Sequence, residues 1–137
     1  MVRQGPIPAF VHGVIEYVWA ALLIAAPFLF SYHADGTATA VSVVAGVVVL
    51  LITAASALPT GLIKSIPVHA HIVLDYILAG LLIAAPFIFA FNADGTPTAF
   101  FIALGVVHLL LTIATRYLRE PRRSRRQDRS SQPTART

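Results

Sequence analysis

The heptapeptide LLIAAPF at residues 22–28 recurs unchanged at residues 81–87, a shift of 81 − 22 = 59 positions. At that shift, residues 12–53 align with residues 71–112, and about 24 of the 42 positions are identical. The match includes the tetrapeptide ADGT, which follows the heptapeptide at residues 34–37 and again at residues 93–96. The chain therefore consists mainly of one unit present twice.

The composition of the chain excludes a soluble globular domain. Of its 137 residues, 57% are hydrophobic and only 12% are charged, whereas about 25% are charged in an ordinary soluble domain. Too few polar side chains remain to cover a surface that faces water. The sequence contains no cysteine, which rules out a disulfide framework, a thiolate metal site and a cysteine nucleophile.

Each repeated unit contains two apolar segments long enough to cross a bilayer, which takes about 20 residues of helix. We predict spans at residues 10–32, 38–58, 69–91 and 97–117. Asp-Gly in both ADGT loops predicts tight turns, in which glycine would supply the positive φ. Because each unit has an even number of spans, both copies enter the membrane from the same side. The predicted fold is all-α, a bundle of four transmembrane helices built from two parallel two-helix repeats, with a pseudo-twofold axis along the membrane normal.

Basic residues give the expected orientation. From Arg116 onward there are eight arginines and two acids, 8 − 2 = +6, while the preceding part carries two basic residues and four acids, 2 − 4 = −2. Arg3, Lys64 and the tail fall on one side of the four-span arrangement, and the ADGT loops lack Lys and Arg. The positive-inside rule then predicts a multi-pass protein of the cytoplasmic membrane with both termini in the cytoplasm.

These features divide the chain into five segments. We predict a cytoplasmic N-terminal segment (1–9), a first membrane hairpin (10–58), a cytoplasmic linker (59–68), a second hairpin (69–117) and a disordered basic tail (118–137). The bilayer is the expected partner, and arginines beside the last span favour anionic lipid headgroups. Nucleic acid is not expected, because the basic residues lie outside the apolar body. The candidate headgroup contacts are Arg116, Arg119, Arg122, Arg123, Arg125 and Arg126.

A proline recurs near the outer end of the first and third spans, as Pro27 and Pro86. A proline inside a helix removes one backbone hydrogen bond and frees the carbonyl four residues earlier, here at Leu23 and Leu82. We therefore expect a helix kink or a loosened last turn at each proline.

The surroundings of these prolines resemble the SPW repeat family of prokaryotic integral membrane proteins. The family's Ser-Pro-Trp motif corresponds to Ala26-Pro27-Phe28 and Ala85-Pro86-Phe87, with the proline kept in both copies. The link Lys64-Ser65-Ile66-Pro67, followed by the segment from His69 to Asp75, also fits the family's second unit. The resemblance covers roughly residues 9–117 and implies a multi-span membrane protein. It implies no established reaction, substrate or catalytic residue.

Two acids lie within the predicted spans, where an ionisable side chain costs about 2.5–3.5 kcal/mol and so suggests a function. Glu16 and Asp75 occupy equivalent positions, each about 9 Å inside the cytoplasmic boundary at 1.5 Å per residue. Each follows a histidine by four residues, His12 and His71. This spacing places the histidine and the acid on the same helix face.

The second and fourth spans add polar groups at similar depth. Thr53 and Thr112 are equivalent, as are Ser56 and Thr115, whereas the counterpart of His108 is Val49. We therefore nominate an intramembrane polar site formed by His12, Glu16, His71, Asp75, His108, Thr53 and Thr112.

The residues leave several interpretations of this site open. In the first, each carboxyl hydrogen-bonds a histidine, threonine or tyrosine and holds the helices together. In the second, the site is a small polar cavity that relays protons or binds a cation. The two His-x-x-x-acid units also offer four N/O ligands of the kind that zinc accepts. Since this spacing is common by chance and the histidines fall near the expected interface, we predict neither a metal nor a cofactor.

The expected function follows from these alternatives. The sequence shows no catalytic triad, phosphate-binding glycine loop or zinc-protease motif, so we expect no enzyme. We expect a non-enzymatic membrane module, structural or accessory to a larger complex. The alternative is a small proton- or cation-coupled transporter, or a ligand-binding membrane protein, that uses Glu16 and Asp75. Assembly into a homo-oligomer or a larger membrane complex stays open.

Overall fold

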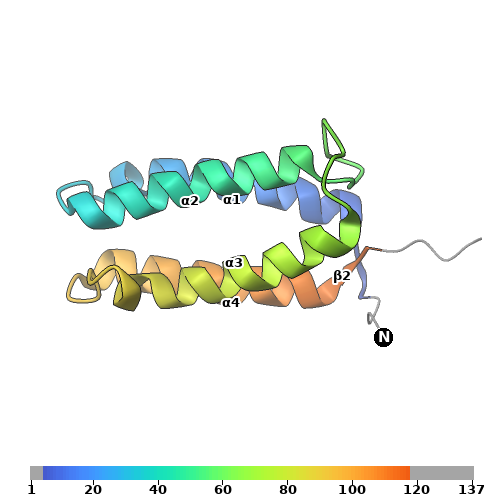
Figure 1. Cartoon of the computed structure of the whole chain (residues 1–137). Coiled ribbons are helices and arrows are strands. Elements are labelled where there is room, and N and C mark those ends of the chain that lie inside the picture. Colours follow the sequence, from blue (N-terminus) through green and yellow to red (C-terminus); the bar gives the residue numbers. More distant parts are fainter. Residues whose placement is uncertain (1–4, 118–137) are drawn as a thin grey trace, which may run out of the picture.

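The computed structural model of the chain describes residues 5–117, and four long helices account for most of them (Figure 1). They are α1 (Ala9–Leu29), α2 (Gly36–Ala55), α3 (Val68–Ile88) and α4 (Gly95–Ala114). Each has 20 or 21 apolar-rich residues, enough to cross a membrane. The predicted all-α bundle of four candidate spans is confirmed. Each predicted span ran about three residues too far, because apolar side chains continue into the turns beyond the helix ends.

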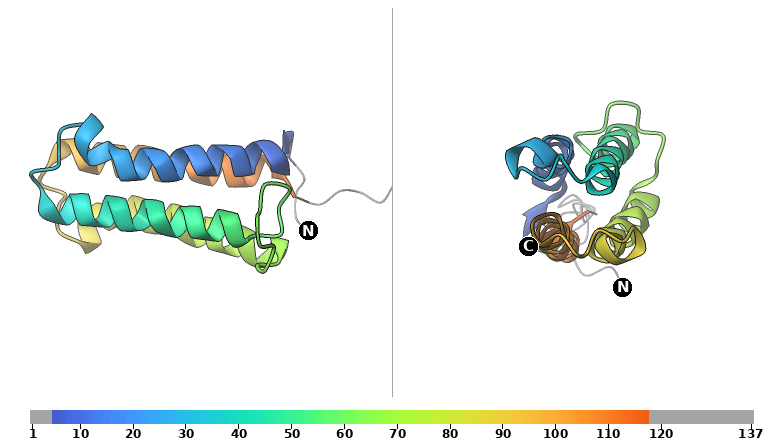
Figure 2. Two further views of the ribbon diagram at one scale, coloured as in Figure 1. Left: turned by 90° about the horizontal axis from the view of Figure 1, so that it is seen from above. Right: turned by 90° about the vertical axis from the view of Figure 1, so that its left-hand side faces the viewer.

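The helices pack as two hairpins, α1 with α2 and α3 with α4. Viewed along the bundle, the helices occupy the corners of a square in chain order, so that α1 lies diagonally across from α3 (Figure 2). Many large apolar side chains on the outer faces are exposed, such as Leu51 and Leu110. This is the arrangement expected of a bundle whose surroundings are hydrocarbon.

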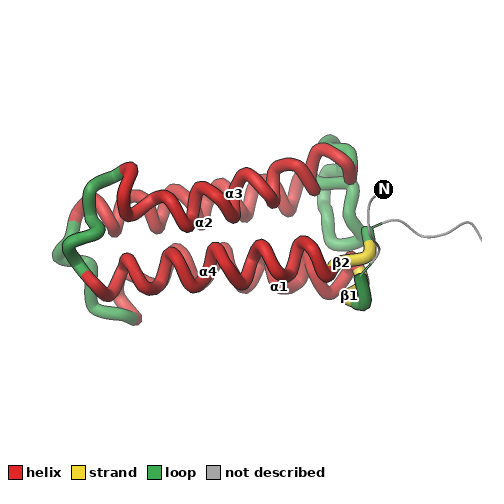
Figure 3. The backbone as a smooth tube through the Cα atoms, turned by 90° about the horizontal axis from the view of Figure 1, so that it is seen from below, coloured by secondary structure: helices red, strands yellow, loops and turns green. Residues whose placement is uncertain are grey.

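All the connections lie at the two ends of the bundle (Figure 3). The segment before α1, the linker between the hairpins and the residues after α4 meet at one end, called the inner end here. The connections at residues 30–35 and 89–94 lie at the other, the outer end. Both hairpins therefore start and finish at the inner end, as parallel repeats do.

Small residues let the two helices of each hairpin approach closely. A methyl group added at Gly46 would lie 2.8 Å from the carbonyl oxygen of Ala20, and one added at Gly105 would lie 3.0 Å from that of Ala79. These distances are too short for an ordinary Cβ, so a larger residue would push the helices apart.

The outer turns differ from what their Asp-Gly sequences predicted. Asp35 and Asp94 are the N-caps of α2 and α4, where their carboxylates accept N–H bonds from Ala38 at 2.9 Å and Thr96 at 3.1 Å. The expectation that the glycines supply the positive φ was wrong, because those glycines already belong to the next helix. The left-handed residues lie just beyond the preceding helices instead, at Ser31 (φ 58°) and Ala90 (φ 56°).

Two short parallel backbone pairings lie at the inner end of the bundle. Strand β1 (Ile7–Pro8) runs parallel to β2 (Thr115–Arg116), with Ile7 opposite Thr115. An isolated bridge joins Ser56 to Ile66 in the same way. Since 7 + 59 = 66 and 56 + 59 = 115, the second pairing is the repeat equivalent of the first. Each hairpin is thus tied to the other by matching contacts that involve Ser56 and Thr115.

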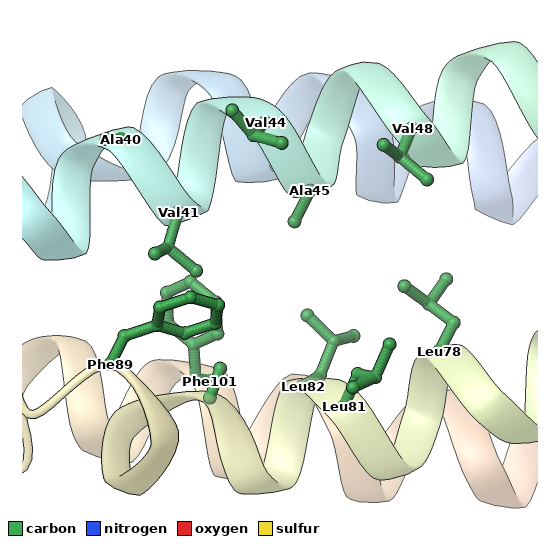
Figure 4. A pocket seen from close by; sticks show the side chains of 11 residues that line it. Ala40, Val41, Val44, Ala45, Val48, Leu78, Leu81, Leu82, Phe89 and Phe101 are labelled. Atoms are coloured by element: carbon green, nitrogen blue, oxygen red, sulfur yellow. The ribbon is translucent and has the colours of Figure 1, made fainter.

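In the outer half, the hairpins leave an apolar groove between α2 and α3 (Figure 4). The groove has a volume of about 380 Å³. Its lining is formed by apolar side chains, mainly from α2 and α3, with Phe101 contributed by α4. This groove is separate from the polar contacts between the hairpins, which lie near the inner end.

Candidate functional site

Four polar side chains meet inside the bundle near its inner end. His12 and Glu16 come from α1, and His71 and Asp75 come from α3. Each pair is four residues apart and so projects from one helix face. All four side chains are only 0–1% exposed. We call these four residues the central cluster.

Each histidine in the central cluster contacts both carboxylates. His12 Nε2 lies 3.4 Å from Glu16 Oε1 and 3.2 Å from Asp75 Oδ2. His71 Nε2 lies 3.4 Å from Glu16 Oε2 and 3.4 Å from Asp75 Oδ1. Two of these four contacts stay within one helix, and the other two cross between the hairpins. The cluster is therefore one connected group and not two independent helix pairs.

The other ring nitrogen of each histidine contacts a hydroxyl group from the opposite repeat. His12 Nδ1 is 2.8 Å from Thr115 Oγ1, and His71 Nδ1 is 2.7 Å from Ser56 Oγ. Each hydroxyl also donates its single proton to a backbone carbonyl four residues earlier, Leu111 for Thr115 and Ile52 for Ser56. With the hydroxyl proton used in this way, the imidazole Nδ1–H must be the donor to the hydroxyl oxygen. With each Nδ1 at a hydroxyl, both Nε2 atoms face the carboxylates.

The two carboxylates have different further partners. Thr53 Oγ1 is 3.2 Å from Glu16 Oε2 and also 2.8 Å from the carbonyl oxygen of Val49. The equivalent Thr112 makes the matching bond to the carbonyl oxygen of His108 at 3.0 Å, so the two threonines differ in the contact of Thr53 with Glu16. Asp75 is one methylene shorter than Glu16, and it accepts a 2.9 Å hydrogen bond from the Tyr117 hydroxyl.

Tyr117 breaks the symmetry of the repeats, because its counterpart at 117 − 59 = 58 is Leu58. Its ring also packs against that of His12, with the centroids 5.1 Å apart. Burial raises the pKa of the Tyr117 hydroxyl well above its usual range, and the nearby Asp75 carboxylate raises it further. Tyr117 therefore stays a neutral hydrogen-bond donor to the central cluster.

His108 lies beside the central cluster. Its ring centroid is 6.3 Å from that of His12, and its side chain is fully buried. Among residues 5–117, neither of its ring nitrogens has a hydrogen-bond partner. The buried Val49 takes its place in the first repeat.

The remaining nominated residues lie away from the cluster. Pro27 and Pro86 are within the last turn of α1 and α3, near the outer end. Arg116 is exposed in β2 at the inner end. The other headgroup candidates lie outside the described residues: Arg119, Arg122, Arg123, Arg125 and Arg126.

Sequence reasoning did not assign roles to three residues of this site. Ser56 and Thr115 were noted for their depth but not as histidine partners, and Tyr117 was not nominated. The equivalence of Ser56 and Thr115 was recognised, but the spacing gave no sign of their histidine partners. Continuing the 59-residue alignment pairs Leu58 with Tyr117, which is the signal that could have drawn attention to Tyr117.

The arrangement can hold protons or a cation. One ligand atom from each of the four cluster residues lies within 4.8 Å of the others. Imidazole nitrogens and carboxylate oxygens both bind protons, and together they are common metal ligands. His108 is not a member of this group of close ligand atoms.

Comparison with known proteins gives one match. The SPW repeat domain matches residues 10–115, which include the central cluster and all of the four helices except the first residue of α1. No curated protein and no solved structure matches the chain. Because the family's domain spans most of the chain and agrees with the two hairpin units, this protein belongs to the SPW repeat family.

Proposed function

We propose that this SPW repeat protein is a non-enzymatic membrane module, structural or accessory to a larger complex, whose two hairpins are joined by the central cluster. The observation that carries the proposal is the pair of contacts that cross between α1 and α3. His12 reaches Asp75 at 3.2 Å, and His71 reaches Glu16 at 3.4 Å. In a low-dielectric interior such contacts resist separation, because separation would leave buried polar groups without partners.

Further contacts support a joining role. The hydroxyls of Ser56 and Thr115 each receive a histidine from the opposite repeat. In contrast, the outer half of the interface contains an apolar groove. Apolar surfaces gain little from association inside hydrocarbon, so polar contacts have a large share in holding the hairpins together.

The burial of the central cluster supports a module without catalysis. Its four side chains are 0–1% exposed, and the groove described above is lined by apolar groups. A substrate would need a route to the reacting groups, and such tight burial argues against one.

We place this module in the cytoplasmic membrane with both termini in the cytoplasm. Lys64 and Arg116 are exposed at the inner end, and the outer connections carry Asp35 and Asp94. A positive inner end favours the cytoplasmic side, where anionic lipids would bind the arginines. A homo-oligomer or a larger membrane complex is the expected assembly.

The second candidate is a proton- or cation-coupled transporter, or a ligand-binding membrane protein. The convergence of Glu16 and Asp75 on the same two histidines favours it. A transporter would also need a hydrated route to the cluster, which distinguishes it from a joining module.

Distance measurements between spin labels test the proposed joining role. The chain has no natural cysteine, so cysteines placed at Leu51 in α2 and Ile77 in α3, both exposed and outside the groove, take labels specifically. In lipid, the parent protein should give a narrow distance distribution. The double substitution Glu16→Gln with Asp75→Asn should broaden it or shift it to longer distances, because the charged partners of both histidines are lost.

The matched control changes carboxylates to amides at the outer end, Asp35→Asn with Asp94→Asn. Asparagine also caps helices well, so the distance between the labels should stay the same. An unchanged distribution in the Glu16 and Asp75 variant would contradict the joining role.

A further inference from the structure

The separations within the central cluster are unusual for direct hydrogen bonds. Its four Nε2–oxygen distances are 3.2–3.4 Å, whereas charged N–H groups usually lie about 2.7–2.9 Å from a carboxylate oxygen. In the part of the chain that the structure describes, His71 Nε2 lies 3.4 Å from both carboxylates but makes no hydrogen bond to either. The four buried side chains of the central cluster thus face one another at Nε2–oxygen distances longer than those of strong hydrogen bonds.

These separations suit ligands that share an ion. A tetrahedral ion with bonds of about 2.0–2.1 Å to nitrogen and oxygen holds its ligands about 3.3–3.4 Å apart. The observed Nε2–oxygen distances are close to this value, although each carboxylate presents a different oxygen to each histidine. The full set of four ligand atoms lies within 4.8 Å, so side-chain rotations that shorten its longest separation by about 1.4 Å would complete a tetrahedron.

The contacts around the histidines are those of metal-binding imidazoles. A metal-ligating histidine normally donates its other ring N–H to a fixed acceptor, which orients the ring. Here Thr115 accepts from His12 Nδ1 and Ser56 accepts from His71 Nδ1. Both hydroxyls are in turn fixed by their bonds to helix carbonyls. This leaves both Nε2 atoms facing the carboxylates, where the Tyr117 hydroxyl lies 3.3 Å from His12 Nε2.

The ligand types and charges select the class of ion. Two imidazole nitrogens with two carboxylate oxygens suit zinc or a similar first-row divalent ion, whereas magnesium and calcium prefer oxygen ligands. Two carboxylates also balance the charge of a divalent ion. A neutral site is favoured where the surroundings are apolar.

We propose that His12, Glu16, His71 and Asp75 bind one divalent transition-metal ion of the zinc type between α1 and α3. The inference goes beyond the joining role, since the cluster can connect the hairpins through its polar contacts alone. The ion would be bound equally by both repeats, with Ser56 and Thr115 orienting the two histidines.

The test uses the full-length protein, stripped of metal by chelation and then equilibrated with Zn²⁺ in lipid nanodiscs. Elemental analysis should find about one bound zinc per chain. Co²⁺ should give the intense visible absorption of a tetrahedral complex. Glu16→Gln with Asp75→Asn, which preserves side-chain volume, should abolish both signals.

Two further comparisons separate the proposed site from adventitious binding. Ser56→Ala with Thr115→Val removes the acceptors that orient the histidines and should weaken zinc binding by about 10–100-fold. His33→Asn with His69→Asn removes histidines outside the cluster and should leave zinc binding unchanged. Spin-label distances and circular dichroism on each variant report whether the fold is kept.

The outcomes distinguish this inference from the proposed function. Absence of stoichiometric zinc, or zinc retained by the folded Glu16 and Asp75 variant, would overturn the metal site. If zinc is absent but the hairpin distances still depend on Glu16 and Asp75, the joining role stands alone. If zinc binds as proposed but Glu16→Gln with Asp75→Asn leaves the hairpin distances unchanged, the metal site stands and the joining role fails.

Discussion

The Ser42 hydroxyl donates a 2.6 Å hydrogen bond to the Leu23 carbonyl oxygen, the group that Pro27 leaves without its helical partner. The Tyr32 hydroxyl lies 2.9 Å from the same Ser42 oxygen. The second repeat differs here. Phe91 and Phe101 replace Tyr32 and Ser42, and their rings pack with centroids 5.2 Å apart.

Substitution of Ser42 should therefore destabilise the first hairpin. Ser42→Ala leaves the buried Leu23 carbonyl and the Tyr32 hydroxyl without this partner, at an expected cost of about 1–3 kcal/mol in unfolding free energy. Unfolding in detergent micelles, followed by circular dichroism, would measure it. Ser65→Ala, an exposed serine in the linker, is the control and should change little. A Ser42 variant as stable as this control would show that the proline carbonyl needs no donor.

Removal of the Tyr117 hydroxyl should also lower the stability. Tyr117→Phe loses the 2.9 Å bond to Asp75, and a hydrogen bond to a charged group contributes about 1.5–3 kcal/mol. Tyr76→Phe changes an exposed tyrosine and should be nearly neutral. Equal unfolding free energies for the two variants would show that Asp75 does not need the Tyr117 hydroxyl.

Alkaline solution should destabilise the protein through its buried tyrosines. Burial raises the pKa of Tyr32 and of Tyr117 in the folded state, whereas an unfolded tyrosine ionises near pH 10. The stabilisation is complete below about pH 10 and declines above it, because only the unfolded chain then loses these protons. Unfolding measured from about pH 8 to about pH 11 checks this. The decline should be shallower in Tyr117→Phe, and an identical slope would contradict the proposed burial effect.

The repeat made much of this structure predictable. The 59-residue shift and the apolar segments give the number of helices, their pairing and their parallel entry. The i, i+4 spacing places His12 with Glu16 and His71 with Asp75 on single helix faces. What spacing could not give is the distance across the bundle, since that depends on how α1 and α3 face each other diagonally.

Departures from the repeat were the hardest features to predict. Position 117 carries a tyrosine where the first repeat has Leu58. The role of this tyrosine became clear only from its hydrogen bond to the shorter acid, Asp75. In the outer turns the positive φ angles lie at Ser31 and Ala90, where the side chains gave no sign of them. The sequence pattern reports burial and period, while the choice of hydrogen-bond partner depends on atoms brought together from residues far apart in the chain.

Glycine at a left-handed position should stabilise the second hairpin. Ala90 has a φ of 56° just beyond α3, a conformation that glycine adopts without the strain of a Cβ. Ala90→Gly should raise the unfolding free energy by about 0.5–1 kcal/mol. Ala84→Gly inside α3 should lower it by a similar amount, since glycine weakens a helix interior. Changes of the same sign at both positions would contradict the assigned backbone conformation.

His108 allows a reciprocal exchange with its repeat counterpart. Its buried ring nitrogens have no partner among the described residues, and Val49 fills the equivalent position in the first repeat. His108→Val should therefore raise the unfolding free energy by about 1 kcal/mol, because the penalty of an unpaired buried imidazole is removed. Val49→His should lower it by about 1–3 kcal/mol for the same reason. If His108→Val instead destabilises the protein, His108 must have an interaction partner in the membrane, and zinc titration of that variant would show whether the partner is the metal site.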